Sequence, residues 1–190
     1  MKRKLLVAIA LGLTLLVVLI RFAPLQPETY RDLAHYAVSV RKFSSCDKER
    51  SFFDEQRANA AYWIIRWNKS GYDSYRDSGR QLLQYAVGKI KCSNDKRRFD
   101  VESDRAIRAI GLALSRGEEI NVLNGNGNTA LHMAVHAGNH HVVKFLLDNG
   151  ASLEAKNSDG ETALQIVLGM VEADIGYDPT HIEPLLRARL

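Results

Sequence analysis

Apolar residues along most of the chain recur at helical spacing. Between residues 30 and 40, and again between 52 and 67, they lie three or four positions apart, and residues 68–71 then break the pattern. Such spacing places apolar side chains on one face of a helix. Alternation of apolar and polar residues never lasts long enough to predict a strand. The chain is therefore predicted to be all-α, and we expect the Trp63 and Trp67 side chains, four residues apart, to pack in a core.

The N-terminal residues follow a different pattern. Lys2, Arg3 and Lys4 precede an uncharged apolar run from Leu5 to Ile20, which is typical of an export signal or a membrane anchor. As a helix the run would span about 24 Å, and its flanking residues would extend it toward the roughly 30 Å of a hydrocarbon core. We expect residues 1–25 to be a signal anchor, inserted in the inner membrane through residues 5–22, with the soluble domain in the periplasm. Cleavage of a signal would instead leave a soluble periplasmic protein.

The net positive charge of the chain comes from this leader. Four of the 26 basic residues lie in the leader, which leaves 22 Lys and Arg against 22 Asp and Glu. The basic character of the whole chain therefore gives no support for nucleic-acid binding. Residues 28–116 nevertheless carry 18 basic and 12 acidic residues, whereas residues 117–190 carry 4 and 10. This division either reflects ordinary solvated helix faces or orients a charged partner.

The chain has two cysteines, Cys46 and Cys92. An even number of cysteines in an oxidising compartment usually forms disulfides. We therefore expect a Cys46–Cys92 disulfide, which would stabilise the fold by about 4 kcal/mol in the chain-entropy model. A pair of buried free thiols is the alternative.

One stretch of the sequence recurs with a period of 33 residues: Gly127, Thr129 and Leu131 return as Gly160, Thr162 and Leu164. A period of this length predicts stacked repeats. Within the first copy Thr129 can cap a helix, Gly138 can end it, and Gly150 can take the left-handed conformation that ends a second helix.

The segment GNTALHMAVHAGNHHVVKFLLDNGAS resembles the ankyrin repeat, which has a turn glycine, a Thr-X-Leu-His tetrad, two helices and a closing glycine. Ala130 stands where that family usually has proline, and Gln165 replaces the histidine in the second copy. Neither change should disturb the fold, because alanine favours helices and glutamine can still bond to nearby backbone. The resemblance implies an ankyrin-type helical solenoid.

Two partial copies extend the resemblance. Residues 79–87 (GRQLLQYAV) align with GNTALHMAV at an offset of 48, but Gly117 aligns with Gly150 at 33, so about 15 extra residues interrupt this copy near 91–105. The C-terminal THIEPLLRARL aligns with the second helix, and Thr180 is its expected N-cap. We expect about three repeats over residues 79–190, the outer two irregular, with an N-terminal helical cap at 28–70.

Four histidines raise the question of a metal site: His132, His136, His140 and His141. Two histidines four apart on a helix can bind a metal. His132, however, occupies the family's structural histidine position, and no cysteine or carboxylate joins the group at ligand spacing. We expect no metal and no cofactor. The familiar catalytic and nucleotide-binding motifs are also absent from the sequence, which predicts a protein that is not an enzyme.

Hairpin tips and inner helices form the concave surface with which ankyrin proteins typically bind partners. Carried over by position, the resemblance implies a partner-binding surface made of Asp77, Ser78, Arg80, Gly125, Asn126, Asn128, His136, Ser158, Asp159, Glu161 and Met170.

These expectations converge on a protein–protein interaction module that faces the periplasm. By analogy with other small exported repeat proteins of Gram-negative bacteria, our preferred interpretation is an immunity protein that inhibits a cognate toxin. The alternative is a scaffold or accessory factor for an envelope enzyme or secretion machinery. A haem or metal handler that uses the histidines is a third hypothesis.

Overall fold

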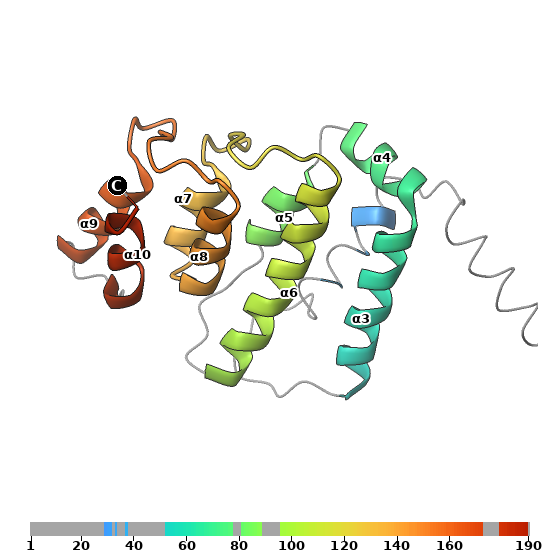
Figure 1. Ribbon diagram of the computed structural model, residues 1–190. Coiled ribbons are helices and arrows are strands. Elements are labelled where there is room, and N and C mark those ends of the chain that lie inside the picture. The colour runs from blue at the N-terminus through green and yellow to red at the C-terminus, as the bar shows by residue number, and fades with distance from the viewer. Residues whose placement is uncertain are drawn as a thin grey trace, which may run out of the picture. The chain divides into compact units, whose positions relative to one another are not determined.

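The described residues of the chain are helices joined by turns, and no strand occurs among them (Figure 1). The computed structural model describes residues 29–31, 33, 37, 52–77, 81–88, 96–172 and 179–189. The all-α prediction is confirmed. The described residues before and after about position 80 belong to two separate compact units.

Several predictions fall outside the described residues. They concern the leader, Cys46, Cys92, Ser78 and Arg80. Within the part of the chain that the structure describes, no helix combines the length and apolar character needed to cross a bilayer.

The first unit contains α3 (Phe52–Trp67) and α4 (Lys69–Asp77). Helix α4 was not predicted, because Gly71 suggested the end of a helix. Asn68 explains it: this buried residue separates the two helices, and its Oδ1 accepts a hydrogen bond from the amide of Gly71, which caps α4. The Tyr30 ring packs against that of Tyr75 at 5.1 Å, and its hydroxyl donates to the carbonyl of Ile65 at 3.3 Å.

The prediction that the tryptophans pack in a core is wrong. Trp63 is 53% exposed and Trp67 is 45% exposed, whereas Ala61 and Ile65 on the same helix are buried. Each tryptophan follows a buried residue by two positions, or about 200° around an α-helix. Helix α3 therefore turns the tryptophans away from the face that it buries.

The second unit stacks three pairs of helices (Figure 1). The pairs are α5 (Leu82–Gly88) with α6 (Lys96–Ser115), α7 (Ala130–His136) with α8 (His140–Asp148), and α9 (Ala163–Glu172) with the short η1 (Pro179–His181) and α10 (Glu183–Arg187). The first helices α5, α7 and α9 contact one another in turn, and α6 contacts α8. This is the helical solenoid that the repeats predicted.

The predicted interruption of the first repeat lengthens its second helix. Helices α6 and α8 end 33 residues apart, at Ser115 and Asp148, as the repeat period requires. Gly117 and Gly150 follow these ends with φ of 83° and 90°, in the left-handed region that glycine adopts without strain. Helix α6 begins at Lys96, 11 residues earlier than the period would place it. Part of the insertion is therefore an additional length of α6.

The C-terminal helix begins later than predicted. Thr180 belongs to η1, and α10 starts at Glu183 after Ile182, which makes no side-chain capping hydrogen bond. Ile182 is buried, and Pro184 fits the first turn of a helix because no intrahelical amide bond is lost there. Burial of Ile182 therefore fixes this start without a polar cap.

Candidate protein-binding site

Each of the two hairpin tips is organised by one asparagine. Oδ1 of Asn124 accepts hydrogen bonds from the amides of Asn126 at 2.9 Å and Asn128 at 3.0 Å. Oδ1 of Asn157, one period later, does the same for Asp159 at 3.0 Å and Glu161 at 2.9 Å. Neither asparagine was predicted to have this role, although an Asn-X-X-Gly pattern that recurs at the repeat period signals this turn.

The two tips are also attached to each other. The amide of Ser158 donates to the carbonyl of Gly127 at 2.9 Å. A Cβ on Gly127 would lie only 1.5 Å from Oγ of Ser158, and Gly127 has a φ of 74°. Glycine is therefore required here for two reasons, and the tips are held in one fixed register.

Below the tips, the tetrad histidine joins two repeats. Nδ1 of His132 accepts from the amide of Thr129 at 3.2 Å, so the proton is on Nε2, which lies 3.0 Å from the carbonyl oxygen of Glu161. Burial lowers the pKa of His132, although the bond to Glu161 opposes this effect. Both ring nitrogens are occupied, which confirms the structural role implied by the resemblance.

The tetrad of the next repeat uses an amide in place of the imidazole. The amide of Thr162 donates to Oε1 of Gln165 at 2.8 Å, and the amide of Gln165 lies 3.4 Å from Oγ1 of Thr162. This geometry reproduces the capping box of Thr129 and His132. The prediction that Gln165 preserves the local fold is confirmed.

The first repeat is capped by a carboxylate distant in sequence. Oε1 and Oε2 of Glu118 accept from the amides of Leu82 at 2.9 Å and Leu83 at 2.8 Å, at the N-terminus of α5. Glu118 is buried, and its negative charge is favourable beside the free amides of a helix start. This role of Glu118 was not predicted from the sequence.

The structure brings together the predicted surface residues of the tips. Gly125, Asn126, Ser158, Asp159 and Glu161 are exposed there, Asn128 is half-buried, His136 is exposed at the end of α7, and Met170 is half-buried in α9. Asp77 was expected at a hairpin tip, but it ends α4 in the first unit and ion-pairs with Arg76 at 3.7 Å. The place of Asp77 in a binding surface remains a prediction.

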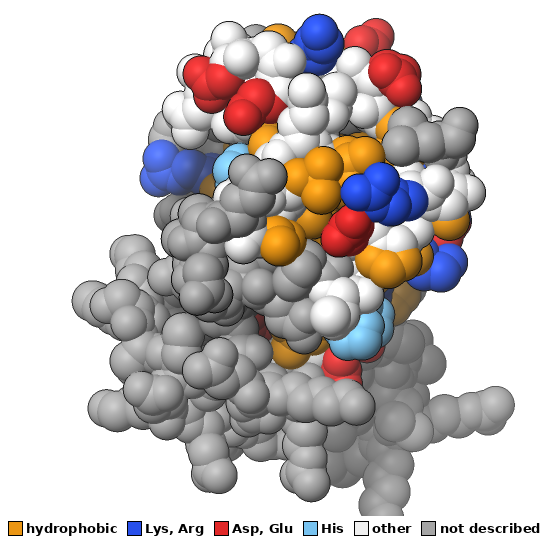
Figure 2. Space-filling view, turned by 90° about the vertical axis from the view of Figure 1, so that its left-hand side faces the viewer, with side chains coloured by type: hydrophobic (Ala, Val, Ile, Leu, Met, Phe, Trp, Pro, Cys, Tyr) orange, Lys and Arg blue, Asp and Glu red, His pale blue; other side chains and the backbone are white. Residues whose placement is uncertain are grey.

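The hairpin edge of the second unit is mainly acidic. Figure 2 shows acidic side chains gathered over the hairpin loops, at the top of the view. Glu119, Glu154, Asp159 and Glu161 are exposed in this part of the chain, with Lys156 as an exposed basic residue among them. The edge is therefore complementary to a positively charged surface.

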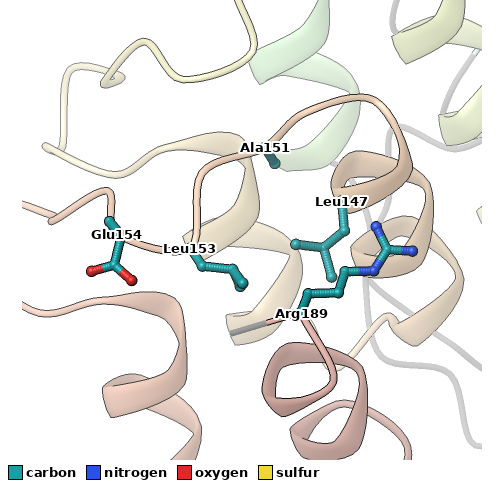
Figure 3. Close-up of a pocket in the computed structure, with 5 residues that line it drawn as sticks. All are labelled: Leu147, Ala151, Leu153, Glu154 and Arg189. Atoms are coloured by element: carbon teal, nitrogen blue, oxygen red, sulfur yellow. The ribbon is translucent and has the colours of Figure 1, made fainter.

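A pocket that the sequence did not predict lies beside the last helix (Figure 3). It encloses about 370 Å3, and Leu147, Ala151 and Leu153 form its apolar lining. Glu154 and Arg189 give its rim opposite charges. Arg189 also ion-pairs with Asp148, whose pKa is lowered by its hydrogen bonds to Lys144 and Arg189.

The four histidines of the sequence analysis do not form one group. His140 and His141 lie beside each other with ring centroids 4.1 Å apart, and His181, which was not considered, lies 5.2 Å from His140. Burial and these two neighbours lower the pKa of His140. Among the described residues, no set of three His, Cys, Asp or Glu side chains is arranged to hold a metal ion.

Comparison with known proteins agrees with the helix pairs. Residues 114–167 match the family model for ankyrin repeats. An ankyrin repeat-containing protein of Caenorhabditis elegans is 37% identical over 89 residues, which are 46% of this chain and 7% of that protein. An ankyrin repeat domain-containing protein of monkeypox virus is 35% identical over 88 residues, 46% of this chain and 18% of that protein. The palmitoyltransferase ZDHHC17 of Homo sapiens is 36% identical over 70 residues, 37% of this chain and 10% of that protein.

The chain thus spans less than a fifth of the length of each of these relatives. What they share is the repeat, which typically serves as a binding module without enzymatic activity. The chain therefore contains ankyrin repeats over residues 114–167, and these repeats indicate a protein–protein interaction module.

Proposed function

We propose that the repeats bind one protein partner through the acidic hairpin edge, and that this partner presents a basic surface. The observation that carries the proposal is the fixed pair of tips. The hydrogen bond from Ser158 to Gly127 and the asparagine-centred turns hold the exposed Asp159 and Glu161 in place before any partner arrives. A preordered surface loses little conformational entropy on binding.

The finer role that we propose is that of an immunity protein. A toxin that attacks nucleic acid or anionic lipid requires a basic surface at its site of action, because its substrate is negatively charged. An acidic protein that covers this surface excludes the substrate by competition. The acidic residues at the tips fit this task, and no chemistry of the chain's own is needed for it.

The proposed location is the periplasm. The apolar run of residues 5–20 after three basic residues supports an inner-membrane anchor with the soluble domain outside the cytoplasm. We propose that Cys46 and Cys92 form a disulfide in that compartment.

Thiol alkylation of unreduced, denatured protein tests for this disulfide. Modification of both cysteines would refute it.

A pair of matched charge reversals tests the binding surface. D159K changes an exposed residue at a tip, and D104K makes the same change at an exposed residue of α6. With the partner isolated from the native envelope, D159K should slow association by about tenfold at low salt, because electrostatic attraction governs encounter. D104K should leave the rate unchanged. Equal rates for the parent and D159K would refute the proposed edge.

Deletion in the native host tests the biological role. Loss of an immunity protein is harmful only while its toxin is produced, so deletion should harm cells that carry the partner's gene and spare cells that lack it. Harm of equal size in both backgrounds would contradict the immunity role and would favour a scaffold for envelope machinery.

A further inference from the structure

Helix α3 carries an exposed aromatic pair that the repeats do not use. The rings of Trp63 and Trp67 stack with centroids 6.4 Å apart and planes inclined by 26°. The guanidinium carbon of Arg66 lies 5.6 Å from the centre of the Trp63 ring. Both indoles are about half exposed, whereas indoles in water-soluble folds are usually mostly buried. The pair therefore forms a small apolar surface with a cation beside it.

The charged residues nearest to the two tryptophans in the sequence are basic. The sequence contains no acidic residue between Glu55 and Asp73, but it contains Arg57, Arg66 and Lys69. Arg66 and Lys69 are exposed on either side of Trp67 in the sequence. An anionic surface placed against the two rings would therefore meet positive charge and no acidic side chain of this stretch.

We propose that this face of α3 rests on the surface of a bilayer that contains anionic lipid. Tryptophan side chains collect at the boundary between headgroups and acyl chains, where the apolar ring is buried and the indole N–H stays near water. Arginine and lysine beside them attract anionic headgroups. The stacked indoles and the guanidinium of Arg66 supply both parts of such a contact.

A sequence feature favours a bilayer over a protein as the occupant. The apolar run Leu5–Ile20 ends 43 residues before Trp63, and it would keep α3 near a membrane if it inserts. The contact does not depend on the acidic hairpin edge, so it can hold or fail independently of the proposed partner binding. A second copy of the chain or another protein on the face would give different results in the test below.

Tryptophan fluorescence can report on this contact, because Trp63 and Trp67 are the two tryptophans of the sequence. The full chain is reconstituted into vesicles of phosphatidylglycerol and phosphatidylcholine, in matched preparations with and without brominated acyl chains. Bromine quenches indoles that reach the acyl boundary, so emission should fall by about twofold or more in the brominated vesicles. Acrylamide, which quenches from water, should act less strongly on vesicle-bound than on detergent-solubilised protein.

A matched pair of variants tests the contribution of charge. K69E places a negative charge at an exposed residue two positions after Trp67, and K144E makes the same change at an exposed residue of α8 in the repeats. K69E should lose most of the bromine quenching in anionic vesicles, whereas K144E should keep it. Thermal unfolding by circular dichroism checks that both variants remain folded.

Three results would overturn the proposal. Emission that bromine leaves unchanged while acrylamide quenches it would place the face in water. Protection from both quenchers would mean that protein covers the face. Equal quenching by bromine in pure phosphatidylcholine, or in K69E and the parent, would show that anionic lipid is not what the face recognises.

Discussion

Nε2 of His132 donates to the main-chain carbonyl of Glu161 across the boundary between two repeats, at 3.0 Å. The same imidazole accepts the amide of Thr129 at 3.2 Å within its own repeat. One buried side chain therefore fixes the start of α7 and also the position of the neighbouring hairpin. This bond also positions the proposed binding edge, because Glu161 is one of the exposed acidic residues of that edge.

H132A should lower the stability of the fold strongly, whereas H132Q should lower it only slightly. H132A removes both bonds and leaves a cavity, and it should lower the free energy of unfolding by about 2–4 kcal/mol. H132Q should cost less than about 1.5 kcal/mol, because Gln165 already fills the equivalent position in the next repeat. Urea denaturation measures both values, and an equal loss in the two variants would contradict the shared role of imidazole and amide.

The stability contributed by His132 should fall in mild acid. Burial lowers the pKa of the folded imidazole below its ordinary value of 6.5, so the unfolded chain binds the proton more readily. The contribution is complete above pH 6.5 and is lost as the pH falls from 6.5 toward the lower folded pKa. H132Q should therefore lose less stability than the parent between pH 7 and pH 5. Identical pH profiles would refute this assignment.

Substitution of Glu118 should destabilise the fold much more than substitution of its neighbour Glu119. E118A leaves two amides at the start of α5 without their acceptor, and it should destabilise the fold by about 1–3 kcal/mol. Glu119 is exposed, so E119A should change stability by less than about 0.5 kcal/mol. Chemical denaturation compares them, and equal effects would show that the cap contributes nothing.

Alanine substitutions at Gly127 and Gly160 should separate the cost of backbone strain from the cost of a steric clash. Gly127 and Gly160 both have positive φ, but only at Gly127 would a Cβ meet a neighbour, Oγ of Ser158. G160A should cost about 1 kcal/mol through strain alone, whereas G127A should cost roughly 1–3 kcal/mol more because the tips must separate. Adding S158G to G127A should recover part of the difference. No recovery would mean that the tips are not packed as described.

The 33-residue period correctly predicted the helices and helix ends that recur in each repeat. It gave α7 and α8, the left-handed Gly150 and the matching Gly117, because each depends on residues a few positions away. The cap at Glu118 joins residues 35 and 36 positions apart, and no local signal marks such a contact. The face of α3 was misassigned because Ala61 and Ile65 are as compatible with burial as the two tryptophans two positions later.

The candidate site could be predicted only in part, for the same reason. The tip residues follow from the 33-residue alignment of Gly127 with Gly160, and the structure exposes Asp159 and Glu161 as that alignment requires. The pocket beside Arg189 depends on where an irregular C-terminal helix meets α8, which the period does not describe. The alignment placed Asp77 at a hairpin tip, but Asp77 belongs to α4, so its part in the binding surface stays a prediction.

Site-specific photocrosslinking in native cells can show whether one protein binds to the hairpin edge. A photoreactive amino acid is placed at Asp159 on a tip in one strain and at Asp104 on α6 in another, since both positions are exposed. If the partner binds at the hairpin edge, we expect one discrete protein adduct from position 159 and no adduct of that mass from position 104. An adduct of the same protein from position 104 alone, or in equal yield from both positions, would contradict it.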